Sequence, residues 1–139
     1  MSLVFPDVNV WLVLTVTHVH QAIAFDWWRR ETRPIAFCRF TQIGLLRLLT
    51  TSAAMDNKPL SMKQAWNAYD VLAGDERVEF VQEPLSVERA FRGLSSSANA
   101  SPKLWADAYL TALAAECGAS IVTFDRSLAR RSVNAVFLV

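Results

Sequence analysis

The chain has 139 residues, 14 basic and 13 acidic side chains, and a formal net charge of +1. Hydrophobic residues make up 53% and charged residues 19% of it, which excludes an intrinsically disordered chain. The net positive charge is too small to indicate, by itself, a protein that binds a polyanion. No apolar run reaches the roughly 18 residues that cross a bilayer. We therefore expect one domain over residues 1–139 and no membrane segment.

The N-terminal residues are mostly apolar and predict a short buried strand, residues 2–6, that runs into a helix. Because no basic region precedes them, we do not interpret them as a signal peptide, and the cytoplasm is the expected location. Cys38 and Cys117 are too few for a disulfide framework and flank apolar residues. We expect both to be reduced core residues.

Apolar spacing predicts three further elements in the first half of the chain. Residues 21–33 have the period of an amphipathic helix, which Pro34 stops. Residues 35–40 are apolar and aromatic and predict a second strand. Residues 41–51 are almost apolar on every side, which is typical of a buried helix.

Cap signals divide the middle of the chain. Ser61 and Gln64 have the spacing of a capping box, and the helix that they open is expected to end at Gly74. A short strand over residues 78–81 and a helix over residues 87–94 follow, the helix with apolar residues at i, i+3, i+4 and i+7.

The C-terminal part repeats the alternation of helix and strand. Ser101 and Pro102 are expected to open a helix that runs to Cys117 and stops at Gly118. Strand, helical turn and strand are then predicted over residues 119–124, 127–131 and 135–139. Short apolar strands separated by helices are typical of a parallel sheet covered on both faces. The predicted fold class is α/β, a three-layer α/β/α sandwich with a short central parallel sheet.

Three acidic residues lie where solvent is not expected. Asp7 and Asp125 each follow an apolar strand, and ligands of open parallel sheets bind beyond the carboxyl ends of the strands. If those strands are neighbours, both side chains point toward one crevice. Asp107 lies in the second turn of its predicted helix, on the inward face, where an unpaired carboxylate is costly. Taken singly, Asp7 and Asp125 can be N-caps and Asp107 can pair with an arginine.

Three carboxylates at one crevice repel one another unless a cation lies among them. Oxygen ligands favour Mg²⁺ or Mn²⁺, and carboxylate-held Mg²⁺ with open positions is suited to phosphoryl chemistry. Other chemistry is poorly supplied, because His18 and His20 are the only histidines and have no nearby Cys or acidic residue for a zinc site. The chain has no glycine-rich nucleotide motif and no nucleophile elbow.

Four segments resemble the PIN-domain family, and more closely the VapC-type toxins of bacterial toxin–antitoxin pairs. They are PDVNVWL, FCRFTQIGLLRLLT, WADAYLTALA and TFDRSLA, at residues 6–12, 37–50, 105–114 and 123–129. Their order and spacing fit nearly the whole chain. The resemblance implies a small α/β/α nuclease that holds Mg²⁺ or Mn²⁺ with acidic residues and cleaves RNA.

The same resemblance assigns the candidate site residue by residue. Asp7 matches the family's first acid, Asp107 its third and Asp125 its fourth, so these three are the expected catalytic and metal-binding residues. The second acid is usually Glu, and Gln42 stands in its place here. An amide carries no charge, so one ion is expected more readily than two. Gln42 and Asn9 are expected to support the ligands through hydrogen bonds.

The resemblance implies an Mg²⁺-dependent endoribonuclease, the toxin of a VapBC-type pair, that hydrolyses RNA phosphodiesters with metal-activated water. It also implies a homodimer and a small VapB-like antitoxin. The alternative is a PIN-like fold that has lost catalysis and serves as an RNA-binding or protein-interaction module, which Gln42 favours. Candidates for binding substrate phosphates, if they are not simply surface arginines, are Arg39, Arg47 and Arg126. Candidates for a dimer or antitoxin surface are Trp27, Trp28 and Trp66, with core packing preferred for Trp66.

Overall fold

The computed structural model describes residues 2–16 and 18–139, and its centre is a five-stranded, fully parallel sheet. Across the sheet the strands are β3 (Val78–Phe80), β2 (Ile35–Phe37), β1 (Val4–Pro6), β4 (Ser120–Thr123) and β5 (Val136–Phe137). The chain first builds outward from β1 to β3, and then crosses to the other side of β1 to add β4 and β5. The point between the carboxyl ends of β1 and β4 is therefore the topological switch point, where open α/β sheets bind ligands.

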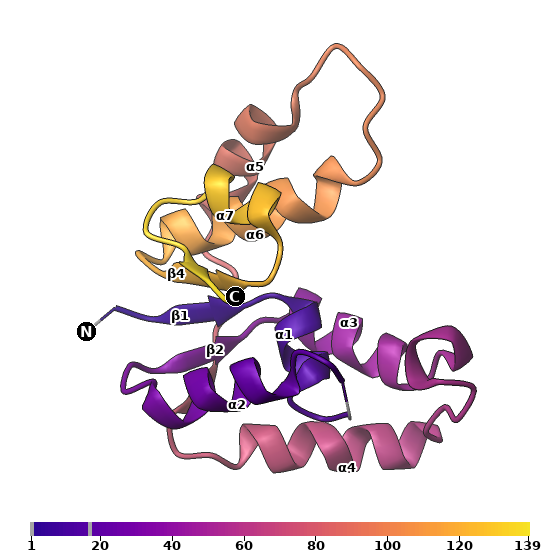
Figure 1. The fold of residues 1–139 in the computed structure, drawn as a ribbon. Helices are drawn as coiled ribbons and strands as arrows, with labels where there is room; N and C mark the ends of the chain where they lie inside the picture. Colours follow the sequence, from indigo (N-terminus) through magenta and orange to yellow (C-terminus); the bar gives the residue numbers. More distant parts are fainter. Residues whose placement is uncertain (1, 17) are drawn as a thin grey trace.

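Helices cover both faces of the sheet, which gives the three layers visible in Figure 1. One layer contains α1 (Val8–Val13), α2 (Gln21–Arg30), α3 (Arg39–Leu49) and α4 (Met62–Ala73), with a 3₁₀ helix η1 (Ser52–Met55) after α3. The other contains α5 (Val87–Ser95), α6 (Leu104–Glu116) and α7 (Arg126–Arg131). The predicted α/β/α sandwich is thus confirmed. Within the described part of the chain, no helix combines the length and apolar character needed to cross a membrane.

The two faces of the sheet form separate hydrophobic cores. On the α1–α4 side, Trp11 stacks on Phe37 with ring centroids 3.7 Å apart and planes 11° from parallel. On the α5–α7 side, Leu113 and Ile121 are fully buried. Strands β1, β2 and β4 are buried along their whole length, as expected for the middle of a sheet covered on both faces.

Several predicted boundaries were wrong: the helix predicted over 41–51 spans Arg39–Leu49, and the strand predicted over 135–139 spans only Val136–Phe137. Three others have a clear local reason. The helix predicted over 21–33 ends at Arg30, because Glu31 adopts an extended backbone. The strand predicted over 35–40 ends at Phe37, because the next residue is already the N-cap of α3. Helix α6 begins at Leu104 and not at Pro102, because residues 101–104 form a backbone turn, with the Leu104 N–H donating to the Ser101 carbonyl at 2.9 Å. The 3₁₀ helix η1 was not predicted.

The predicted caps fared better. Ser61 and Gln64 form the expected capping box: the Gln64 amide donates to the Ser61 hydroxyl at 3.1 Å, and the Ser61 amide donates to the Gln64 side chain at 2.9 Å. Helix α4 ends at Gly74, as predicted. Gly118 follows α6 with φ +63°, a left-handed conformation that glycine adopts at little cost.

The tryptophans exchange their expected places. Trp27 is 8% exposed and lies in the core, whereas Trp66 is 46% exposed and lines a groove between α3 and α4. Core packing for Trp66 was therefore wrong: Ala65 takes the inward position on α4, and a helix turns the next residue about 100° away from it. Cys38 is buried and Cys117 half-buried, and both are free thiols.

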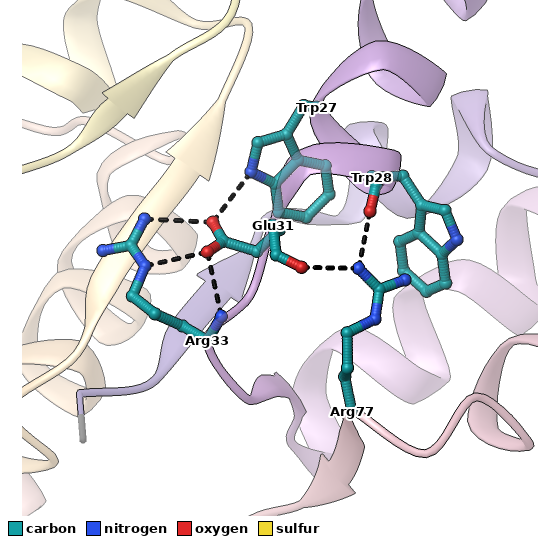
Figure 2. A network of polar contacts seen from close by, with 5 residues as sticks. All are labelled: Trp27, Trp28, Glu31, Arg33 and Arg77. Carbon is teal, nitrogen blue, oxygen red and sulfur yellow. Dashed lines mark hydrogen bonds and ion pairs between the residues drawn. The ribbon is translucent and has the colours of Figure 1, made fainter.

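An arginine joins the end of α2 to the turn before β3 (Figure 2). The Arg77 guanidinium donates to the carbonyls of Trp28 and Glu31 at 2.6 and 2.7 Å, pairs with Asp75 at 2.9 Å, and lies 4.6 Å from the Trp28 ring centroid. The last carbonyls of a helix have no partner within the helix. Arg77 supplies the partners here and ties α2 to the edge of the sheet.

The Glu31 carboxylate beside it is held from three sides (Figure 2). It accepts hydrogen bonds from the Trp27 indole at 3.1 Å, from the Arg33 guanidinium at 2.9 and 3.0 Å, and from the Arg33 backbone N–H at 3.1 Å. Burial alone would raise the pKa of Glu31, but these hydrogen bonds outweigh burial and hold the pKa below its usual value. The network fixes the chain between α2 and β2.

We expect Arg77→Ala to lower the free energy of unfolding by about 2–3 kcal/mol, because helix carbonyls lose charged donors and the indole loses its cation. Urea unfolding monitored by circular dichroism measures this loss. The matched control is Arg92→Ala, which removes an exposed ion pair with Glu88 at 3.0 Å and should cost at most about 0.5 kcal/mol. Equal losses in the two variants would contradict the assignment of Arg77 as a helix cap.

Helix α3 packs tightly against the start of α1. A Cβ atom added to Gly44 would lie 2.7 Å from one methyl carbon of Val8, closer than real Cβ contacts. The glycine therefore lets the backbone of α3 approach Val8, which directly follows Asp7. This contact brings the N-terminal half of α3 to the carboxyl end of β1.

Candidate functional site

Two of the predicted acids lie at neighbouring strand ends. Asp7 follows β1 and Asp125 follows β4 after one residue, and β1 and β4 are paired in parallel with Pro6 opposite Val122. The carboxylates therefore share the switch point of the sheet, as expected from the sequence. Both also serve as N-caps: Asp7 accepts from the Val10 amide at 3.0 Å, and Asp125 accepts from the Ser127 amide at 2.8 Å. Capping and a ligand role are thus compatible.

Thr123 connects the two acids and was missed by the sequence analysis. Its hydroxyl donates to the Asp7 carboxylate and accepts from the Asp125 backbone N–H at 2.9 Å. The side chain is fully buried at the last position of β4. A polar residue that ends an apolar strand two positions before an acid was the available signal, but the whole strand was interpreted as apolar.

Asp7 is the most buried of the three acids, with 8% of its surface exposed. Burial raises the pKa of its carboxyl, hydrogen bonds from Thr123 and the Val10 amide lower it, and the charge of Asp125 raises it again. The net result is a pKa above the usual value for aspartate. Asp7 is therefore a carboxylate whose negative charge the fold stabilises incompletely.

Asp107 lies in the first turn of α6, one turn earlier than predicted, and is half-buried. Burial raises its pKa, and the charge of Asp125 raises it further, while Arg131 and Lys103 act in the opposite direction. No ion pair within 4.0 Å joins Asp107 to an arginine in the described ranges 2–16 and 18–139. Pairing with an arginine, the alternative left open for this residue, is not observed there.

Asp125 is exposed and influences the other two acids. Its charge raises the pKa of both Asp7 and Asp107, so Asp125 lies within electrostatic range of each of the other two acids. Each raised pKa reflects a cost of holding negative charge. A bound cation would relieve this repulsion at all three positions.

The donor set suits a hard divalent cation, although the acids do not form a closed chelate. Among the residues that the structure describes, no group of three or more His, Cys, Asp or Glu side chains is arranged to hold a metal ion. Mg²⁺ commonly uses one or two carboxylates and keeps several waters, so an open arrangement of carboxylate oxygens is compatible with it. The carboxylate oxygens of these acids fit Mg²⁺ or Mn²⁺.

Gln42 and Asn9, the predicted supporting residues, lie on the helices that follow β2 and β1. Gln42 is 6% exposed, and its side-chain oxygen accepts a hydrogen bond from Arg39 at 2.5 Å. The hydrogen-bond donor to the Gln42 oxygen is therefore the cationic side chain of Arg39. Asn9 is exposed in the first turn of α1.

The remaining candidate residues make other contacts. Arg47 lines the groove beside Trp66, and the Arg126 guanidinium lies 5.2 Å from the Phe137 ring centroid. His18 and His20 are exposed, with ring centroids 5.2 Å apart, which agrees with the prediction of a solvated loop.

Comparison with known proteins shows which family and which structures this chain is similar to. Residues 4–134 match the family model described as the PIN domain. The chain is 38% identical over 126 residues to ribonuclease VapC41 of Mycobacterium tuberculosis, and the match covers 86% of each chain.

Solved structures show the same fold at low sequence identity. The M. tuberculosis toxin VapC20, described as cleaving the sarcin–ricin loop, superposes with a TM-score of 0.68 and 14% identity, covering 95% of this chain and 98% of that one. VapBC2 of Rickettsia felis, solved bound to a promoter DNA fragment, gives a TM-score of 0.62 and 13% identity, covering 97% and 96%. With the family model matching nearly the whole length and a VapC ribonuclease as a relative, this chain belongs to the PIN-domain family.

Proposed function

We propose that the protein is an endoribonuclease, the toxin of a VapBC-type toxin–antitoxin pair. The observation that supports this most directly is that Asp7 and Asp125 follow the paired strands β1 and β4, and that the charge of Asp125 acts on both Asp7 and Asp107. The relative named ribonuclease VapC41 supports the same activity.

The three acids have different tasks in this proposal. Asp7 and Asp107 would hold Mg²⁺ or Mn²⁺, because burial destabilises their charges in the absence of a cation. Asp125, exposed and fixed by its cap to α7, would complete the site or orient the attacking water. When bound, the ion supplies an acidified water and neutralises charge on the phosphodiester. Thr123 keeps the Asp7 carboxylate in place between the two strand ends.

A second candidate is a PIN-domain protein without catalysis that binds RNA or another protein. The observation that favours it is Gln42, whose neutral side chain removes a negative charge from the group of acids and bonds to Arg39. The three retained carboxylates favour the nuclease. In a protein that binds no cation, repulsion between these carboxylates would lower stability and serve no function.

An RNA cleavage assay on the wild type and on Asp107→Asn distinguishes the two candidate functions. We expect the wild-type protein to cut single-stranded RNA in Mg²⁺ and to stop in excess chelator. Asp107→Asn should reduce the rate by about 100-fold or more, because the half-buried carboxylate is replaced by a weaker neutral ligand. Time courses on a labelled RNA, resolved on denaturing gels, measure both effects.

The control for this test is Glu116→Gln, an exposed acid at the last position of the same helix. It should cleave like the wild type. Undiminished cleavage by a folded Asp107→Asn protein would reject the assignment of Asp107. RNA binding without any metal-dependent cleavage by the wild type would favour the second candidate.

We also propose that the protein acts in the cytoplasm as a homodimer with a small VapB-like antitoxin. The toxin–antitoxin assemblies among its structural relatives support such a partner. An apolar groove of about 420 Å³ between α3 and α4, lined by Ile43, Met62 and Trp66 among others, offers surface for a protein contact. Light scattering on the purified protein without its partner measures the oligomeric state, and a dimer is expected.

A further inference from the structure

The first residue of α3 presents a cation that is held in place and is not neutralised. Arg39 donates to the side-chain oxygen of Gln42 at 2.5 Å, and its guanidinium carbon lies 4.7 Å from the Phe80 ring centroid. The residue is nevertheless exposed. Within residues 2–16 and 18–139, no carboxylate lies within 4.0 Å of it as an ion-pair partner. Its charge is therefore available to a ligand.

The other arginines that hydrogen bonds fix in place differ in this respect. Arg33 and Arg77 are held by hydrogen bonds and are both paired with a carboxylate, Glu31 and Asp75, at 2.9 Å. Those two guanidinium groups are internal parts of the fold. Arg39 is held by one hydrogen bond to a neutral partner and by its contact with the Phe80 ring, so it combines an anchored position with an uncompensated charge.

Arg39 also lies on the rim of the sheet that carries the acids. It begins α3 two residues after β2 ends, and β2 is the parallel neighbour of β1. The close approach of Gly44 to Val8 holds the same part of α3 against the helix that Asp7 caps. The guanidinium lies over Phe80, the last residue of β3, and is therefore at the carboxyl ends of the strands, the side of the sheet on which Asp7 and Asp125 also lie.

We propose that Arg39 binds a phosphate of the RNA substrate and that Gln42 is the positioning residue that holds it. This proposal rests on the ribonuclease function proposed above and names one substrate contact of that site. A guanidinium offers a planar fork that fits phosphate oxygens, and it costs less ordering on binding when it is already anchored.

The neutral character of Gln42 is essential to this role. A carboxylate at the same buried position would form an ion pair with Arg39 and cancel the charge that binds phosphate. The Gln42 oxygen that accepts from Arg39 is also less available as a metal ligand. Compared with a carboxylate at this position, Gln42 provides no charged metal ligand, but it anchors a cation that can neutralise charge on the substrate.

Salt-dependent RNA binding tests this site independently of cleavage. Fluorescence anisotropy with a short, labelled single-stranded RNA in EDTA gives Kd between about 50 and 200 mM KCl, a range in which each phosphate contact contributes about −0.7 to the slope of log K against log salt. We expect Arg39→Gln and Gln42→Glu each to make this slope shallower by about 0.7. The double variant should lose no more than either single one.

Two controls separate charge from structure. Gln42→Leu removes the anchor and leaves the charge of Arg39, so it should weaken binding modestly with an unchanged slope. Arg29→Gln, an exposed arginine on α2, should bind like the wild type. Circular dichroism establishes that each variant is folded.

The outcomes separate this site from the function on which it rests. Wild-type cleavage of RNA with an unchanged slope for Arg39→Gln would overturn the phosphate site alone. A Gln42→Glu protein that cleaves faster and binds RNA as tightly as the wild type would also overturn it, by showing that position 42 acts as a metal ligand. Absence of both RNA binding and cleavage in the wild type would overturn the proposed function and this site together.

Discussion

Asp7→Asn is expected to reduce RNA cleavage strongly and, at the same time, to stabilise the protein. The amide oxygen preserves the N-cap of α1, because Asn is as good a cap as Asp, and the Thr123 hydroxyl, which donates to the carboxylate, can accept from the amide nitrogen instead. It removes a buried negative charge that the fold stabilises incompletely. Cleavage should fall by about 100-fold or more. The melting temperature at neutral pH in EDTA should rise by about 2–6 °C, or roughly 1–2 kcal/mol.

The pH dependence of this gain has a definite sign. Because the pKa of Asp7 is raised in the folded protein, the folded state holds this proton more tightly than the unfolded state does. The contribution of Asp7 to stability is therefore lost as pH rises from the unfolded pKa of about 3.9 through the higher folded value. The advantage of Asp7→Asn should be complete above that window and vanish below it.

Thermal melts in EDTA and in Mg²⁺ or Mn²⁺ provide the measurement. A divalent ion should stabilise the wild type and have much less effect on Asp7→Asn. Glu79→Gln, an exposed acid on β3, is the control and should show no gain at neutral pH. A lower melting temperature for Asp7→Asn than for the wild type in EDTA would contradict the claim that the Asp7 charge is held at a cost.

Thr123→Val is expected to have the largest effect on stability at the site. The valine has nearly the same shape, but it deprives the buried Asp7 carboxylate of a donor and the Asp125 N–H of its acceptor. Leaving such groups without partners costs about 1–3 kcal/mol, and more when the group is charged. We expect a loss of about 2–4 kcal/mol in urea unfolding, with cleavage reduced because Asp7 loses its orientation.

The pH profile of this variant carries a second readout. The hydrogen bond from Thr123 lowers the pKa of Asp7, so its loss should raise that pKa further. The acidic limb of the rate profile should therefore move to higher pH in Thr123→Val. Thr123→Ser keeps the hydroxyl and loses one methyl group, so it should recover the wild-type profile at a cost of about 1 kcal/mol. A Ser variant as impaired as the Val variant would indicate that packing, not hydrogen bonding, is the role of Thr123.

Periodicity and caps were sufficient to predict the layers of this fold, because each strand is short, apolar and separated from the next by a helix. The positions of Asp7 and Asp125 at adjacent strand ends followed from the same pattern and are confirmed by the pairing of β1 with β4. Which strands are neighbours is a tertiary fact, however. The sequence analysis had to state it as a condition.

Local boundaries and individual side chains were harder to predict. The start of α6 at Leu104 depends on a backbone turn, not on the residue types of Ser101 and Pro102. The role of Thr123 depends on a hydroxyl that contacts Asp7 across two strands, which no local spacing reveals. Trp66 was misplaced because an aromatic residue at helical spacing is typical of both a core and an exposed groove.

The connection from β3 to α5 has a practical consequence for controlling this protein. Everything before it, including Asp7 and the α1–α4 layer, belongs to one side of the boundary between β1 and β4, and Asp107 and Asp125 belong to the other. If the chain were cut at the exposed residues 82–83, each of the two fragments would carry only some of the three acids. RNA cleavage would then require the two inactive fragments to associate. This topology is therefore a suitable starting point for a split nuclease whose activity depends on fragment assembly.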